Sequence, residues 1–189
     1  MNTPAHLIVG AAAFGRRESA QVTFAALLGA FLPDLSLYVL SGWHILILDT
    51  PPSVVFRELY YSDLWQQIFG VDNSFILWGL LCGLAVWRRV PWAIALTGAA
   101  LLHLALDFPL HTHDARMHFW PLTDWKFESP ISYWDPRRGG RVVELVEGAI
   151  VAALTLWLVI RYRAWVWRAV FVGLALLQLA PVILWRLIL

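Results

Sequence analysis

The sequence predicts an all-α fold, a polytopic membrane bundle of about five to six helices with an outward-facing cap and one amphipathic helix at the membrane interface. Hydrophobic residues make up 60% of the 189 residues and charged residues only 14%, whereas soluble domains carry about 25% charged residues. The mean hydropathy is +0.65, and the apolar residues gather into runs of helical length. We therefore expect residues 1–189 to form a single integral membrane domain.

Apolar runs predict the helices in chain order. The first, residues 4–14, is too short to cross a bilayer unaided at about 1.5 Å per residue. Residues 54–69 pair apolar with polar side chains at helical spacing, which is typical of a helix lying in the interface. Residues 111–141 are rich in tryptophan, proline and charge, and we expect them to fold as a cap that crosses nothing. The remaining expected helices are 21–40, 74–87, 91–110, 142–160 and 165–187.

The net charge, the cysteine count and the positions of the arginines indicate the kind of partner, the absence of disulfides and the membrane orientation. The formal net charge is +1, so nothing indicates a nucleic-acid partner, and the single cysteine, Cys82, excludes an internal disulfide. Arginines mark alternate short connections at positions 16–17, 88–89 and 161–163. The positive-inside rule makes that side cytoplasmic. We expect a multi-pass protein of the cytoplasmic (inner) membrane, with the cap facing the periplasm or exterior.

Candidate metal ligands concentrate in one stretch, because four of the six histidines lie between positions 103 and 118. His103 and Asp107 are four residues apart, which places both on one face of a helix. After Pro109 the chain supplies further candidates in His111 and His113. Imidazole and carboxylate groups in an apolar setting suit a divalent metal, and we expect Zn²⁺ in particular. The same segment continues with Asp114 and His118.

Polar residues from distant parts of the sequence, most of them ionisable, fall at one depth of the predicted bundle. Burying such groups in a membrane is costly, so they mark functional sites, and scattered structural polar residues are not expected to converge in this way. Glu147 is a candidate general base or a partner of a ligating histidine. Besides those named above, the set comprises His6, Asp34, Asp72, Asn73, Glu144 and Glu147.

Each residue also has a purely structural interpretation. His103 and Asp107 can be a hydrogen-bonded pair that locks two helices together. Pro33 and Asp34 can mark a helix exit, since proline bends helices and aspartate satisfies freed amides. Histidines in a cap loop are often simply exposed. Glu144 can be a helix start stabilised by the helix dipole.

Three motifs carry a resemblance to a known family. The segments HLIVGAAAFG, GAFLPDLSLY and ALLHLALDFPLHTHD resemble those of the membrane-bound metal-dependent hydrolases, also described as LexA-binding inner-membrane-associated hydrolases. That family is similar in helical core and ligand pattern to the zinc phospholipase C and nuclease group. The resemblance covers the chain to about position 122 and implies that His6, Asp34, His103 and Asp107 are metal ligands.

The chain departs from the family pattern at two places. The family usually reads PDxD, and the second acid is here Ser36. A central HRxxTHS-like segment is replaced by VDNSF at 71–75. To complete a second metal position, Asp72 or histidines of the cap such as His111 and His113 would have to substitute.

Together these patterns predict a metal-dependent hydrolase. A bound divalent metal with an open position activates water and polarises an ester or phosphoryl oxygen, with Glu147 and Asp72 as the catalytic candidates. The site opens at the outer interface among membrane lipids, which favours a lipid-like or phosphoester substrate. The alternative is a non-catalytic, metal-stabilised scaffold, or a transporter of metal or small solutes. A transporter would show polar residues at both depths or an inverted repeat, and the sequence shows neither.

Overall fold

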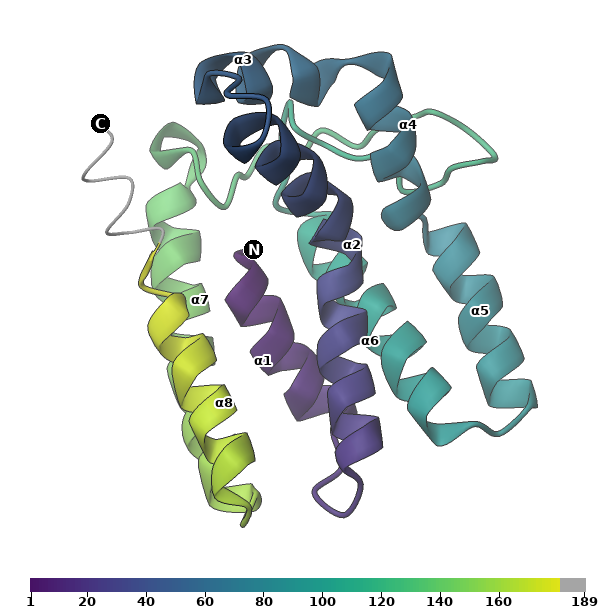
Figure 1. The fold of residues 1–189 in the computed structure, drawn as a ribbon, viewed down its shortest axis with the longest axis vertical. Coiled ribbons are helices and arrows are strands. Elements are labelled where there is room, and N and C mark those ends of the chain that lie inside the picture. The colour runs from purple at the N-terminus through teal and green to yellow at the C-terminus, as the bar shows by residue number, and fades with distance from the viewer. Residues whose placement is uncertain (181–189) are drawn as a thin grey trace.

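A computed structural model of the chain describes residues 1–180. Every regular element in this range is a helix, as the composition predicted (Figure 1). Two short 3-10 turns, η1 (Leu59–Tyr61) and η2 (Pro136–Arg138), join the longer elements. The α-helices are α1 (Thr3–Phe14), α2 (Ala20–Leu46), α3 (Pro52–Arg57), α4 (Asp63–Asp72), α5 (Phe75–Trp87), α6 (Pro91–Asp107), α7 (Gly140–Arg161) and α8 (Trp165–Leu177).

Three segments are long and apolar enough to cross a membrane. They are Ala20–Leu46, Asp63–Trp87 and Gly140–Arg161. The second of these comprises α4 and α5, which are separated only at Asn73 and Ser74. Large apolar side chains cover the outer faces of α5 and α7, where Leu80 is 69% exposed and Leu145 is 75% exposed. An apolar outer surface of this kind suits lipid better than water.

The short helix α1 is surrounded by other helices and forms the centre of the bundle. It packs against α2, α6, α7 and α8. Its residues Ala5, Ile8 and Ala11 are fully buried, in one cluster with Leu158 and Phe171. A helix of 12 residues therefore obtains its stability from packing on every side, because a helix of this length is marginal in isolation.

Helices α2 and α6 are in close backbone contact. A Cβ atom added to Gly29 would lie only 1.9 Å from the carbonyl oxygen of Leu96. The contact fixes the position of Asp34 on α2 relative to His103 and Asp107 on α6. Pro33 lies inside α2 without ending it, and the helix runs six residues beyond the expected end at position 40. In this extra length, the Ser41 hydroxyl donates to the Leu37 carbonyl at 2.5 Å, so its polar group is satisfied within the helix.

The expectation of one amphipathic helix over residues 54–69 is wrong in its continuity. The segment is divided into α3, η1 and α4, with breaks at Glu58 and Ser62. Its apolar side chains bury themselves against the end of α2, next to Leu37, Leu40 and Ile45. Folding the segment onto α2 requires changes of chain direction that a single helix does not allow. The buried residues are Val55, Tyr60, Trp65 and Phe69.

Residues 108–139, called the cap below, fold as an ordered irregular layer at one end of the helices. Backbone hydrogen bonds hold the cap together and join it to α5. Within the cap, Tyr133 N donates to the Leu110 carbonyl at 3.0 Å, and from α5, Phe75 N donates to the His118 carbonyl at 2.8 Å. The expected helix 91–110 ends earlier, at Asp107, and residues 140–141 already belong to α7. The expected helix 165–187 is formed to Leu177, and its positions 181–187 lie outside the described residues.

The arginine-bearing connections meet at one end of the molecule. Figure 1 shows the turns between α1 and α2, between α5 and α6, and between α7 and α8 at the same end, opposite the cap and α3. The alternation inferred from the arginine positions is therefore present in the fold. The cap end holds the candidate ligands.

Candidate metal centre

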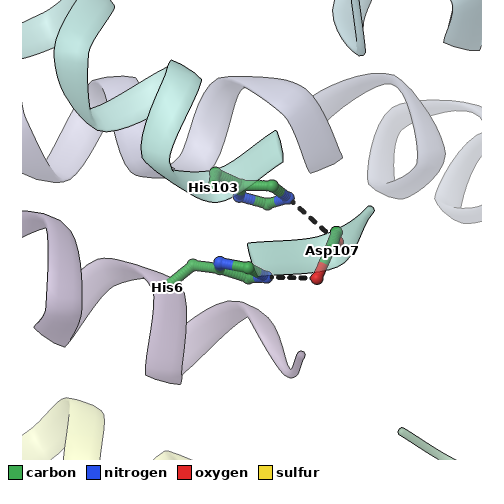
Figure 2. A group of neighbouring side chains, drawn as sticks. All are labelled: His6, His103 and Asp107. Carbon is green, nitrogen blue, oxygen red and sulfur yellow. Dashed lines mark hydrogen bonds and ion pairs between the residues drawn. The ribbon is translucent and has the colours of Figure 1, made fainter. Parts of the chain in front are cut away.

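His6, His103 and Asp107 form the heart of the site. Figure 2 shows the two imidazoles stacked, with Asp107 beside both rings. The ring centroids lie 3.6 Å apart at an interplanar angle of 12°. One possible ligand atom from each of the three residues lies within 4.8 Å of the other two. Such a group can hold a single metal ion.

Helix geometry and packing bring these residues together. On α6, the four-residue spacing places His103 Nε2 3.3 Å from Asp107 Oδ2. Helix α1 supplies His6 from the opposite side, with Nε2 2.9 Å from Asp107 Oδ1. All three residues are buried, with exposed fractions of 1% for each histidine and 5% for Asp107.

Asp34 joins the group from α2. Its Oδ1 atom lies 3.7 Å from His103 Nε2. Its Oδ2 atom accepts a hydrogen bond of 2.5 Å from the hydroxyl of Thr3, which lies one turn before His6 on α1. The structure thus brings together His6, Asp34, His103 and Asp107, all of which the sequence singled out.

His111 extends the group from the cap. Its Nε2 atom lies 3.2 Å from Asp107 Oδ2, and its Nδ1 atom lies 2.9 Å from Asp114 Oδ2. Burial alone would lower the pKa of His111, but the carboxylates of Asp107 and Asp114 outweigh burial and raise it. Burial alone would raise the pKa of Asp114, but hydrogen bonds from His111 and Trp134 hold it well below its usual range. The α-amino group of Met1 also contacts Asp107.

The hydrogen-bond pattern shows which ring nitrogens face the carboxylates. His103 Nδ1 lies 2.7 Å from the Ala30 carbonyl oxygen, which can only accept, so Nδ1 carries the proton of this bond. In a neutral ring the Nε2 lone pair then faces the oxygens of Asp34 and Asp107. His111 repeats the arrangement, since its Nδ1 is taken by Asp114 and its Nε2 faces Asp107.

Lone pairs that face carboxylates repel them unless a proton or a cation lies between. Supplying a separate proton to each ring would place like charges next to one another in a buried site, which is costly. His6 Nδ1 and His103 Nε2 are buried and have no hydrogen-bond partner among the described residues. Mixed imidazole and carboxylate donors, with the other ring nitrogen of two histidines fixed by a carbonyl or a carboxylate, fit a divalent cation such as Zn²⁺.

Other predicted residues lie outside this group. The side chain of His113 is exposed and packs beside Trp134, with ring centroids 5.4 Å apart. Asp72 is the last residue of α4, and the hydroxyl of Ser36, at the position where the resembled family has its second acid, is buried on α2 without a hydrogen-bond partner among the described residues. His118 is buried and its Nδ1 bonds to the Asn73 carbonyl at 2.9 Å. Glu144 is exposed on α7.

Glu147 is buried, in contrast to Glu144. Its Oε1 atom accepts from the backbone and side-chain nitrogens of Asn2, at 3.1 and 2.8 Å, and from Gln178. Its Oε2 atom is buried and has no hydrogen-bond partner among residues 1–180. Because Asn2 follows Met1, which contacts Asp107, Glu147 is connected to the metal group through two adjacent residues.

Sequence reasoning did not single out Thr3, Asn2 or Arg116. Thr3 precedes His6 by three positions, which places the two on one helical face, so its spacing was a usable signal. Asn2 carries no comparable pattern. Arg116 is the one arginine in the histidine-rich segment HTHDARMH, and its position among predicted ligands was its only local signal.

Comparison with protein-family models, with characterised proteins and with solved structures finds no match. The interpretation of the site therefore depends on its geometry.

Proposed function

We propose that this chain is a multi-pass protein of the cytoplasmic membrane that binds a divalent metal, first of all Zn²⁺, and hydrolyses a lipid-like substrate at the outer interface. The single observation that carries the proposal is the arrangement of His103: Nδ1 is committed to Ala30, while Nε2 lies 3.3 Å from Asp107 and 3.7 Å from Asp34. A divalent cation turns this repulsive arrangement into a favourable one. We include the chain with the membrane-bound metal-dependent hydrolases on the motifs that it shares with them.

The ligands in this proposal are His6, Asp34, His103 and Asp107, with His111 as a further donor. When bound, a divalent cation with an open coordination position lowers the pKa of water to about 7 and polarises the bond to be broken. Glu147 is the general base: its Oε2, which has no partner among residues 1–180, accepts a proton from the attacking water, and Asn2 and Gln178 hold the carboxylate in place through Oε1. Water adds to the carbonyl carbon or the phosphorus, the bond to the leaving group breaks, and Glu147 returns the proton to that group.

The membrane arrangement in the proposal uses five to six helical segments, including the shorter helices α6 and α8. The arginine-bearing turns face the cytoplasm and the cap faces outward, as the positive-inside rule indicates. Cysteine substitution of the exposed residues Ser53 and Thr123 tests the orientation. Both should react with an impermeant thiol reagent on intact cells, and protection of both until lysis would reverse the orientation.

Metal analysis of the detergent-purified protein tests the proposal most directly. We expect about one divalent ion per chain, a lower thermal midpoint after chelation, and recovery of that midpoint when Zn²⁺ is restored, because metal binding is coupled to folding. Mixed micelles of phospholipids and of neutral glycerides then serve as substrates, with and without chelator. Protein that neither contains nor takes up metal refutes the metal centre, whereas bound metal without turnover of any lipid identifies a metal-stabilised scaffold.

A further inference from the structure

Arg116 is a buried cation in the cap without an ordinary partner. Only 6% of the surface of Arg116 is exposed. Among residues 1–180 its guanidinium makes neither a hydrogen bond nor an ion pair, and its Nη1 atom is completely buried. Buried charged groups are almost always paired, since removing them from water is costly. Arg116 therefore carries an unused capacity to bind an anion.

Aromatic rings hold Arg116 through the face of the guanidinium. The Cζ atom lies 4.1 Å from the ring centroid of Phe69 and 4.8 Å from that of Tyr60. Cation–π contacts use the flat face of the group and leave its N–H edge free. That edge is the part that binds a phosphate or carboxylate through two parallel hydrogen bonds.

The acids near Arg116 are engaged elsewhere. The carboxylate of Asp114 accepts from His111, from Trp134 Nε1 at 3.0 Å and from Thr112 N at 3.0 Å. Asp107 faces the histidines of the metal group. Among residues 1–180, no carboxylate forms an ion pair with Arg116 within 4.0 Å, and its Nη1 atom has no hydrogen-bond partner. An incoming anion thus meets no internal competitor in direct contact.

A second cation accompanies Arg116. Lys126 Nζ donates to the amide oxygen of Gln66 at 2.6 Å, and the Gln66 amide nitrogen donates to the Tyr60 carbonyl at 2.6 Å. The hydrogen bond of Lys126 is thus to a neutral group. Burial and the positive charge of Arg116 together lower the pKa of Lys126. Residues of η1 and α4 therefore contact both cations of the cap.

The cationic pair adjoins the metal group. Arg116 follows Asp114, which bonds to His111, and His111 in turn contacts Asp107. On the other side, the backbone of His118 donates to the Arg116 carbonyl at 3.0 Å, and His118 Nδ1 bonds to the Asn73 carbonyl at 2.9 Å. A substrate held at Arg116 would lie beside the proposed ligands.

We propose that Arg116, assisted by Lys126, is a binding site for the phosphate group of a phosphoester substrate. This inference rests on the proposed function for its substrate and narrows it from lipid-like esters in general to molecules that carry a phosphate. The shared chemistry is a tetrahedral oxyanion, supplied either by a phospholipid headgroup or by a soluble phosphoester. The aromatic rings fix the plane of the guanidinium before the anion arrives, which reduces the entropy lost on binding.

Binding measurements on purified protein in a neutral detergent test the site. The probes are dihexanoyl phosphatidic acid, dihexanoylglycerol with the same tails but no phosphate, and glycerol 3-phosphate. We expect the intact protein to bind a phosphate-bearing probe and not dihexanoylglycerol. Preference for phosphatidic acid identifies a lipid source, and equal binding of glycerol 3-phosphate identifies a soluble one.

Variants test whether phosphate binding depends on Arg116 itself or only on the overall positive charge of the cap. Arg116→Gln should weaken phosphate binding by about tenfold or more, as expected for a lost charge-assisted pair. Arg137→Gln is the matched control, because Arg137 is in the same cap but its side chain is 89% exposed and already paired with Asp135. Should Arg116→Gln fail to fold, Lys126→Gln, at a partly exposed site, should still weaken binding by about fivefold.

Metal content is measured in parallel, and binding is repeated after chelation, so that the two proposals can fail separately. Loss of the metal centre appears in metal content and leaves the Arg116-dependent binding in place. Absence of phosphate binding by the intact protein overturns the inference. So does equal binding by the Arg116→Gln and unmodified proteins, or, where only Lys126→Gln folds, equal binding by that variant.

Discussion

Two buried polar clusters, one around Thr23 at the arginine end and one around His103 at the cap end, differ in how completely their groups are hydrogen-bonded. At the arginine end, Thr23 donates to the Arg16 carbonyl at 2.9 Å and lies 3.0 Å from the Tyr162 hydroxyl, while Arg16 N donates back to Thr23 at 3.1 Å. At the cap end, buried atoms of His6, His103, Glu147 and Arg116 have no partner among the described residues. Folded proteins satisfy nearly all such groups. The cluster around Thr23 is therefore satisfied by its own hydrogen bonds, whereas the cap-end group leaves several buried polar atoms available to a ligand.

Among the variants proposed, removal of the His103 side chain should have the largest effect on metal binding and hydrolysis. His103→Ala removes the ring whose Nε2 faces Asp34 and Asp107, so we expect metal affinity to fall by more than about a hundredfold and hydrolysis to fall to background. The thermal midpoint should approach that of the chelated protein. Metal analysis and thermal unfolding measure both. His113→Ala is the control, because that exposed histidine lies outside the group, and undiminished metal in His103→Ala would refute the site.

Substitution of Glu147 should separate binding from chemistry. Glu147→Gln keeps the shape and the bonds to Oε1 but removes the proton acceptor at Oε2, so we expect turnover to fall by about 10²- to 10⁴-fold with metal content unchanged. Initial rates and metal analysis on one preparation check this. Glu144→Gln, on the exposed face of the same helix, should match the unmodified protein. Loss of metal in Glu147→Gln would make Glu147 a structural or ligating residue.

Pushing α2 away from α6 should weaken metal binding at the cap end, because the two helices carry different ligands of the site. Gly29→Ala places a Cβ against the Leu96 carbonyl and should destabilise the protein by about 2–3 kcal/mol, with weaker metal binding because Asp34 moves away from His103. Gly79→Ala on α5 meets nothing within 4 Å and experiences the same change in helix propensity. Unfolding in detergent compares the two variants. Equal stabilities would show that the helices are not held at this contact.

At the arginine end the effect should be smallest. Tyr162→Phe removes one hydroxyl from a buried, satisfied cluster, so we expect a loss of about 1 kcal/mol in stability and unchanged metal content and turnover. Thermal unfolding and metal analysis measure these. A decrease in metal binding similar to that of Gly29→Ala would show that the two ends are not independent.

Much of the fold was predictable because it depends on local chemistry. Apolar runs of helical length identified most helices, and the spacing of His103 and Asp107 placed both on one face. His6 and Asp34 were identified from their polarity in apolar surroundings. The continuous helix over 54–69 failed for a physical reason: periodicity reports which side chains are buried, while the changes of direction at Glu58 and Ser62 come from packing on α2.

The sequence by itself determined the helical class, the apolar surface and the residues that can ligate a metal. Only the tertiary structure decided which of them meet. His111 and His113 are two positions apart and equally suited as ligands, yet the cap directs His111 to Asp107 and leaves His113 exposed. The rings that contact the face of the Arg116 guanidinium likewise come from η1 and α4, which are distant in sequence, and its Nη1 atom has no partner among residues 1–180. Composition and spacing indicate which groups each residue can offer. The direction in which a side chain points depends on contacts between segments that are distant in sequence. A lone pair or a charge can bind a ligand only if its side chain points toward it.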